Sequence, residues 1–310
     1  MLINNVRVIW IHMELILSRS VDCLCDFTYD FYWQHKGKRL DPSGVIPDQQ
    51  GSSLTYSDIV SLLKKGEDVY IKGNAGRRLG SSLGVDLKFF GGNGRSLKVG
   101  SIIVEGDVDS RMGISMLSGA IFVKGSVKQP LGNVIEVESD RKGFRKYRSI
   151  TDILQGGRND KIILPNIMKG DTLLINDGLI RDTVAARLDS EKKIVIEGNA
   201  GMSTGILMKR GSVHVEGDSG KNTGVLLNGG SVIVNDTEEF AGAYMRDGIL
   251  IIYGKSKGFV GANMKGGRIF YKGEAMIKHT QPDGKDIRML IRLLGISGIH
   301  AMMFKKYYIQ

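Results

Sequence analysis

The stretch GMSTG at positions 201–205 matches G-x-S-x-G, the pattern that presents the nucleophilic serine of many esterases and lipases. A second match, GSSLG, spans positions 80–84. The serines at the two centres, Ser203 and Ser82, are therefore candidate nucleophiles for attack on an ester carbonyl. The histidines that could act as a general base are His214, His279 and His300.

The residues that follow Ser203 argue against this chemistry. A nucleophile elbow joins a strand to a long helix that supports the serine. Here six residues separate Gly205 from SVHVEG, which alternates polar and apolar residues as a strand does. The two glycines also have another explanation, because they belong to a repeat.

From residue 194 the chain repeats itself with a period of 18 or 19 residues. Glycines mark three columns of this repeat, and Asp236 stands in the gap of the third. The columns are Gly205, Gly224, Gly242 and Gly261; Gly211, Gly230, Gly248 and Gly267; and Gly198, Gly217, Gly254 and Gly273. Asn222 and Glu239 take the place of Ser203 in this alignment, which favours a turn position over a nucleophile.

Short strands with period-two alternation precede the third column. Their inward residues form pairs that align from repeat to repeat: Ile194 and Ile196, Val213 and Val215, Val232 and Val234, Leu250 and Ile252, Ile269 and Tyr271. A second apolar column runs through Met116, Met208, Leu227, Met245 and Met264. We expect these residues to be buried and the outer face of the strands, with His214, to be largely exposed.

This pattern predicts an all-β solenoid, a right-handed parallel β-helix of about seven coils with short capping helices. Glycine suits the corners, because it adopts positive φ and carries no Cβ to collide with the next coil. The first half repeats less cleanly, with insertions at 85–97 and 139–161. Residues 181–188 predict a short helix.

Three regions follow from this interpretation: an N-terminal extension over 1–55, the β-helix over 56–275 and a helical cap or tail over 276–310. We expect the true start to be Met13. A first capping helix has Ser57 as its expected N-cap and stops at Gly66, and a second runs from about Asp286 to Leu294 before Gly295. The apolar tail after it has an alternative role in docking a partner subunit.

Other candidate sites are weak. The loop GGNGRS at 91–96 lacks the strand, helix and lysine of a phosphate-binding loop. His12, His35 and the other histidines have no metal-ligand spacing, so no metal and no cofactor is expected. Cys23 and Cys25 predict reduced thiols in a cytoplasmic protein. No apolar run is long enough to span a membrane.

The most basic segment is ESDRKGFRKYRSI, residues 138–150, inside the second insertion. Aromatic residues alternate there with cations, and insertions in solenoids often contact partners. The candidate partner-binding residues are Arg141, Lys142, Phe144, Arg145, Lys146, Tyr147 and Arg148. A partner protein, a solvated loop and a nucleic acid or anionic cofactor are the open interpretations. The net charge of +10 is spread along the chain, which favours a solvated surface.

The segment GNAGMSTGILMKRGSVHVEGDSGKNTGVLLNGGSVIV, residues 198–234, resembles the GXGXG family of right-handed β-helices. That family includes the β-helical subunit of formylmethanofuran dehydrogenase in methanogenic archaea and the C-terminal domain of the glutamate synthase large subunit. The resemblance covers roughly Val69–Gly132 and Lys193–Gly273. It implies a β-helix that carries no catalytic residue and holds catalytic domains or subunits in register.

The resemblance therefore implies a non-catalytic scaffold subunit of an oxidoreductase complex, with other protein subunits as partners. The formylmethanofuran dehydrogenase subunit is the nearer type, because there the β-helix is a separate polypeptide. A homo-oligomer is an alternative, and no membrane or nucleic-acid partner is expected. Two alternatives to the scaffold come from the residues: a serine hydrolase that uses Ser203 or Ser82, and a binding module that uses the basic insertion.

Overall fold

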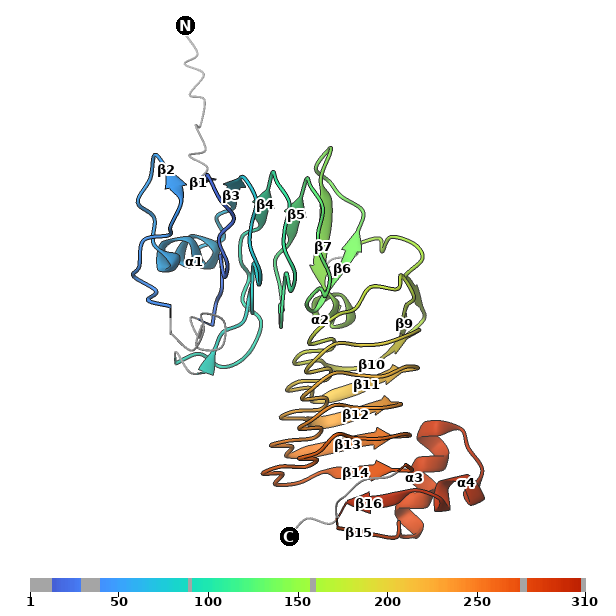
Figure 1. Cartoon of the computed structure of the whole chain (residues 1–310). Helices are drawn as coiled ribbons and strands as arrows, with labels where there is room; N and C mark the ends of the chain where they lie inside the picture. Colours follow the sequence, from blue (N-terminus) through green and yellow to red (C-terminus); the bar gives the residue numbers. More distant parts are fainter. Residues whose placement is uncertain (1–12, 29–39, 89–90, 157–159, 274–277, 308–310) are drawn as a thin grey trace, which may run out of the picture.

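The computed structural model describes residues 13–28, 40–88, 91–156, 160–273 and 278–307. The chain folds into a β-solenoid of about nine coils, which form two stacks. Figure 1 shows the first stack running across the view and the second running down it, so that the molecule is bent like an elbow. The expectation of an all-β solenoid is confirmed, with about nine coils where the sequence predicted about seven.

The first stack has a parallel core of four strands. In spatial order these are β1 (Met13–Leu17), β3 (Val69–Lys72), β4 (Ile102–Val104) and β5 (Ile121–Val123). Antiparallel strands close both edges: β2 (Gln49–Gln50) pairs with β1, while β7 (Arg145–Ser149) pairs with β5 and carries β6 (Val134–Val137).

The second stack has six parallel strands: β9 (Thr172–Ile175), β10 (Asp189–Ile196), β11 (Arg210–Val215), β12 (Asn228–Val234), β13 (Asp247–Ile252) and β14 (Arg268–Tyr271). Its edges are closed by β8 (Ile167–Lys169) on β9, and by β16 (Lys305–Tyr307) with β15 (His279–Thr280) on β14. Antiparallel strands at the ends cover backbone groups of the parallel sheets that would otherwise recruit another chain.

Like residues stack on like residues in the core. Ile194 aligns with Val213, Val213 with Val232, Val232 with Leu250 and Leu250 with Ile269, one coil after another. All five are completely buried, and so are Met116, Met208, Leu227 and Met245, with Met264 7% exposed. The two apolar columns predicted from the sequence are confirmed.

Two coils lie where the sequence did not predict them. Strand β1 and the residues after it form a coil on β3, inside the segment expected to be an extension. Residues 181–188 form a coil corner, so the expected short helix is wrong. Thr183, Ala185 and Arg187 have φ values of +57°, +61° and +56°, which no right-handed helix allows.

Four short helices accompany the coils in the described parts of the chain. Helix α1 (Tyr56–Lys64) packs its Ile59, Val60 and Leu63 into the core of the first stack. Its N-cap is Thr55, which forms a capping box with Asp58, so the expected cap at Ser57 is wrong. Helix α2 (Ile150–Leu154) follows β7 directly.

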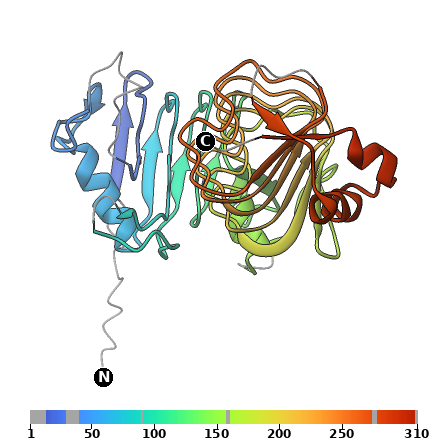
Figure 2. The same ribbon diagram turned by 90° about the horizontal axis from the view of Figure 1, so that it is seen from below.

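Helix α3 (Gly284–Leu294) ends at Gly295, as predicted, and is followed by α4 (Gly298–Met302). These helices lie against the outer face of the second stack (Figure 2), where Leu290 and Phe304 pack on Ile251 and Phe270. The outer face of β12–β14 is therefore covered rather than exposed.

The corner next to each core strand has an unusual backbone, with positive φ at every second residue. In one coil Ser203, Gly205 and Leu207 have φ values of +58°, +75° and +57°. The amides of Ser203 and Leu207 donate forward to Lys221 O and Val225 O, while that of Gly205 donates back to Val184 O. One corner thus ties a coil to both of its neighbours.

Glycine is required in these columns for two different reasons. Gly205 has positive φ, and a Cβ there would also lie 2.5 Å from Val232 Cγ2. Gly217 has no positive φ, but a Cβ would lie 2.2 Å from Asn199 Oδ1 of the preceding coil. That oxygen accepts a hydrogen bond from the Asp218 amide, so the third column leaves room for side chains that join successive coils.

At the elbow between the two stacks, side chains replace the backbone acceptors of this corner. The Ser115 amide donates to Thr183 Oγ1, and the Ala185 amide donates to Asn133 Oδ1. The amide nitrogen of Asn133 donates in turn to Met116 O and Thr151 Oγ1. Asn133 is fully buried, so these bonds form a polar seam inside the core.

Gly205→Ala should lower the free energy of unfolding by about 2–5 kcal/mol, the sum of a left-handed alanine and an overpacked core. Gly178→Ala is the matched control: φ is +71° there, but nothing lies within 4 Å of the position that a methyl group would take. It should lose about 1–2 kcal/mol. Denaturant unfolding compares the two, and equal losses would contradict the close contact with Val232.

Asn133→Ala should weaken the elbow, because it leaves the buried Ala185 amide without its acceptor. We expect a loss of about 2–4 kcal/mol and a calorimetric trace that separates into two transitions, one for each stack. Asn235→Ala, which removes an exposed hydrogen bond to Asp218, is the control and should keep the wild-type trace. A single thermal transition at the wild-type temperature in Asn133→Ala would refute the proposal that the polar seam holds the two stacks together.

Candidate functional site

Both candidate nucleophiles lie at left-handed corner positions. Ser203 is 8% exposed and Ser82, with φ of +53°, is 4% exposed. The residues that occupy the place of Ser203 in the following coils are Asn222 and Phe240, with φ of +61° and +65°. The expected equivalent Glu239 is wrong by one residue, because Gly205 corresponds to Gly242, two residues after Phe240.

The candidate bases do not meet these serines. His214 lies on β11, where burial and the nearby Lys193 lower its pKa. His279 is on β15 edge-on to Tyr271, and the Nδ1 of His300 lies 3.2 Å from Ser297 Oγ. Within the described part of the chain, no hydrogen bond links either serine hydroxyl to a histidine. His12 and His35 lie outside the described residues.

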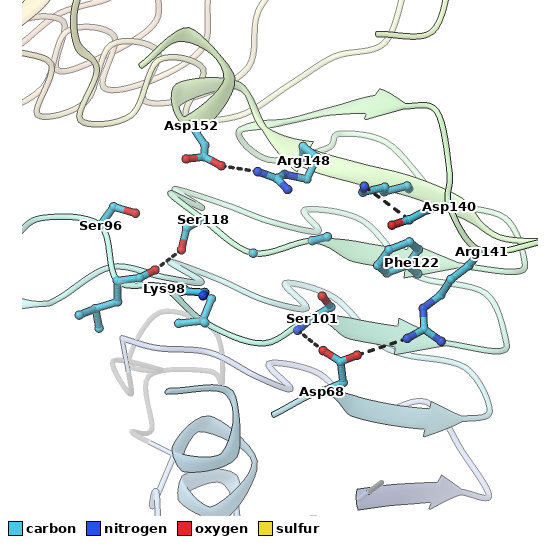
Figure 3. Close-up of a pocket in the computed structure, with 15 residues that line it drawn as sticks. Asp68, Ser96, Lys98, Ser101, Ser118, Phe122, Asp140, Arg141, Arg148 and Asp152 are labelled. Atoms are coloured by element: carbon cyan, nitrogen blue, oxygen red, sulfur yellow. Dashed lines mark hydrogen bonds and ion pairs between the residues drawn. The ribbon is translucent and has the colours of Figure 1, made fainter. Parts of the chain in front are cut away.

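A polar pocket of about 500 Å³ lies on the outer face of the first stack. It is enclosed by β5, by loop residues 96–101, by the β6–β7 hairpin and by α2 (Figure 3). The basic segment predicted to bind a partner forms one wall, because it is a hairpin paired with β5 rather than an irregular insertion.

Arg141 crosses from the hairpin to the far side of the pocket. Its Nη2 lies 3.2 Å from Asp68 Oδ2 and donates to the Tyr70 hydroxyl at 3.0 Å. Its guanidinium carbon is 5.3 Å from the centre of the Tyr70 ring and 5.2 Å from that of Phe122. Figure 3 shows Arg141 and Asp68 directed toward one another. An ion pair and two cation–π contacts hold this side chain in place.

Lys146 and Arg148 form the deep part of the wall, and their side chains are 7% and 6% exposed. Lys146 Nζ lies 3.0 Å from Asp160, while Arg148 Nη2 donates to Asp152 at 2.5 Å. The Nε of Arg148 is buried and has no hydrogen-bond acceptor among the described residues. These buried pairs attach the hairpin to α2 and to the segment after it.

The remaining residues of the hairpin have structural contacts or face solvent. Arg145 forms a bidentate pair with Glu136, which raises its pKa, and lies over the Tyr147 ring. Tyr147 is in the core of the first stack, where burial raises its pKa. Phe144 packs beside Phe122, and Lys142 is exposed.

The charges that line the pocket nearly cancel. Four cations, Lys98, Arg141, Lys146 and Arg148, face three carboxylates, Asp68, Asp140 and Asp152. The sequence revealed the cations but missed their partners, since Asp68 lies 73 residues before Arg141 and Asp160 follows the hairpin. Most of the basic character of residues 138–150 is therefore used to fold the hairpin.

Other candidate chemistry is limited in the parts of the chain that the structure describes. No cluster of three His, Cys, Asp or Glu side chains is placed to hold a metal ion there. Burial raises the pKa of the Cys23 thiol to about 12 and that of Cys25 further still. In the loop after β3, the Asp86 carboxylate accepts from the Asn93 amide, which in a nucleotide loop would face phosphate. Among these residues no helix is long and apolar enough to cross a membrane.

The comparisons agree with the repeat. Residues 148–289 match the model of the GXGXG motif family. An uncharacterized protein of Methanothermobacter thermautotrophicus is 50% identical over 201 residues, 65% of this chain and 64% of that protein. The chain thus spans just under two thirds of that relative's length.

Among solved structures, a chain of the formyltransferase/hydrolase complex of Methylorubrum extorquens, solved with methylofuran, covers 93% of this chain and 91% of its own length. The identity is 19% and the TM-score 0.32. A likeness this distant does not define a function.

The fold defines a β-solenoid protein. Residues 148–289, which include the second stack with its stacked glycine corners, are similar to the GXGXG motif family.

Ser203→Asn and Ser82→Asn should leave any hydrolysis of short-chain esters unchanged, because asparagine suits a left-handed corner. Asn222 already occupies this position in the next coil. The measurement is initial rates with a p-nitrophenyl ester, with unfolded protein as the blank. A loss of activity in either folded variant, measured against wild type, would restore the hydrolase hypothesis.

Proposed function

We propose that the chain is a non-catalytic scaffold subunit of a complex that contains several different subunits. Its relatives in this role would be the β-helical subunit of formylmethanofuran dehydrogenase and the β-helix of glutamate synthase. A GXGXG β-helix holds catalytic domains or subunits in register in those proteins. The match of residues 148–289 to this family is the observation that carries the proposal.

The mechanics of the corners support this role. Each left-handed corner donates hydrogen bonds to the coil before and the coil after it, as Asn222 and Gly224 do to Glu239 O and Thr204 O. Together with the strand ladders, these bonds connect every coil to its neighbours on two sides. A stack in which each coil is fixed to both of its neighbours suits a spacer between catalytic units.

The position of Ser203 also supports the scaffold over the hydrolase. Serine, asparagine and phenylalanine occupy the same corner in successive coils, with nearly equal φ. The common requirement is therefore a backbone conformation and not a hydroxyl group. The chemistry of the complex would then come from its partner subunits, in an oxidoreductase complex in the cytoplasm of a methanogenic archaeon.

The basic hairpin is the second docking candidate from the sequence. Lys142 and the exposed edge of Arg141 and Arg145 would contact a partner, while Lys146 and Arg148 remain in their buried ion pairs. A binding module of this kind would show affinity for polyanions that falls steeply with salt.

Purification of the native protein under gentle conditions tests the proposal. We expect the chain to co-migrate in fixed stoichiometry with at least one catalytic subunit on size exclusion with light scattering. The same protein expressed alone is the control and should run at its own mass of 34.0 kDa. A native protein that runs alone at that mass would contradict a scaffold role.

A further inference from the structure

One edge of the second stack carries three exposed aromatic residues, Phe240, Tyr244 and Phe259, which we call the corner ladder. Their exposed fractions are 38%, 53% and 66%. The rings of Phe240 and Phe259 stack with centroids 4.8 Å apart and an angle of 9° between their planes. Leu207 and Leu226, half-buried, occupy the place of Tyr244 in the two preceding coils.

All three aromatic residues have left-handed backbones. Their φ values are +65°, +54° and +51°, a conformation that is unfavourable for a bulky side chain and much easier for asparagine. Asn222 occupies the place of Phe240 one coil earlier, and Asn263 that of Tyr244 one coil later. The fold therefore accepts asparagine at these positions, and aromatic side chains strain it.

Exposure adds a second cost. The parts of large apolar side chains that remain in contact with water gain nothing from the hydrophobic effect, and a contiguous group of such side chains typically marks an interface. Strain and exposure coincide at the same three positions. This coincidence indicates that the aromatic rings stabilise an assembly rather than the free chain.

The two flanks of the ladder differ in charge. On one flank Lys221 pairs with Glu239 and Lys257 with Glu238, so that side is neutral. The other flank carries the exposed cations Lys209, Arg210, Arg246 and Lys265. Lys209 and Arg210 share the single carboxylate of Asp189. Among the described residues, Arg246 and Lys265 have no ion pair, although the exposed Asp247 follows Arg246 directly. With Asp189 and Asp247 counted, this flank keeps a net charge of about +2.

We propose that the corner ladder is the docking surface for a different protein of the complex, apolar where it covers the rings and acidic where it faces Arg246 and Lys265. This inference rests on the scaffold role proposed above. The net positive charge of one flank, where Arg246 and Lys265 have no ion pair among the described residues, favours an acidic partner surface. A second copy of this chain would present either a neutral or a basic flank, so it lacks that complementarity.

The test replaces the ladder with the residues that the corner prefers: Phe240→Asn, Tyr244→Asn and Phe259→Asn together. The matched control is Val45→Asn, Leu164→Asn and Ile299→Asn, which removes apolar side chains that are 58%, 74% and 72% exposed, more than those of the ladder, from other surfaces. Both tagged variants and the wild type are expressed in the native host, and the protein that co-purifies with wild type is identified and titrated against each purified chain.

We expect the ladder variant to bind this partner at least tenfold more weakly than the control, and to melt at a higher temperature than wild type when free. Arg246→Glu with Lys265→Glu should also weaken binding tenfold or more, and added salt should reduce the difference. A melting temperature below that of wild type would mean that the ladder stabilises the free chain, which overturns the inference.

The remaining outcomes separate the two proposals. Undiminished binding of the ladder variant overturns the docking surface and leaves the scaffold role standing. A wild-type chain that purifies alone overturns both. A wild-type homodimer that the ladder variant dissociates overturns the partner chemistry, because the surface would then serve self-association.

Discussion

The structure depends on a corner in which every second residue is left-handed. Ser203, Gly205 and Leu207 illustrate it, with amides that donate in turn to the next coil, the previous coil and the next. Because two directions of hydrogen bonding come from one short segment, neither neighbour can be removed without leaving buried amides unpaired. The central position faces the core, where Val232 leaves no room for a Cβ, so it is glycine in most coils.

At the elbow between the two stacks, the regular succession of left-handed corners is interrupted. The β6–β7 hairpin occupies the edge on which the next coil would continue, and β7 pairs antiparallel with β5. The amides of Ser115 and Ala185 then face side chains, Thr183 and Asn133, in place of backbone carbonyls. A parallel backbone bridge between Leu131 and Arg181 also crosses this junction, and the second stack beyond it runs in a new direction (Figure 1).

The sequence was most informative where glycine spacing and strand alternation agree. The second stack, its core columns and the end of α3 at Gly295 follow from patterns that local sterics impose. The coil at 181–188 was missed because Ala185 stands in the glycine position with φ of +61°, which hides the repeat. The equivalence of Ser203 with Phe240 was missed by one residue, because one repeat is 18 residues long and its neighbours 19.

The candidate sites were harder to predict, because their partners are distant in sequence. The cations of residues 138–150 suggested a binding surface, but Asp68, Asp152 and Asp160 neutralise three of them inside the fold. No local pattern reveals such pairs, since the coils bring together residues dozens of positions apart.

The aromatic residues at the corners present the opposite case. They occupy turn positions of the repeat with the same positive φ as their equivalents in other coils, and only their bulk and their exposure set them apart. The charge of a residue that forms an ion pair within the chain is explained by the fold. The fold does not explain a strained and exposed aromatic ring. In a scaffold without its own chemistry, residues that destabilise the free chain are therefore better markers of function than residues that could react.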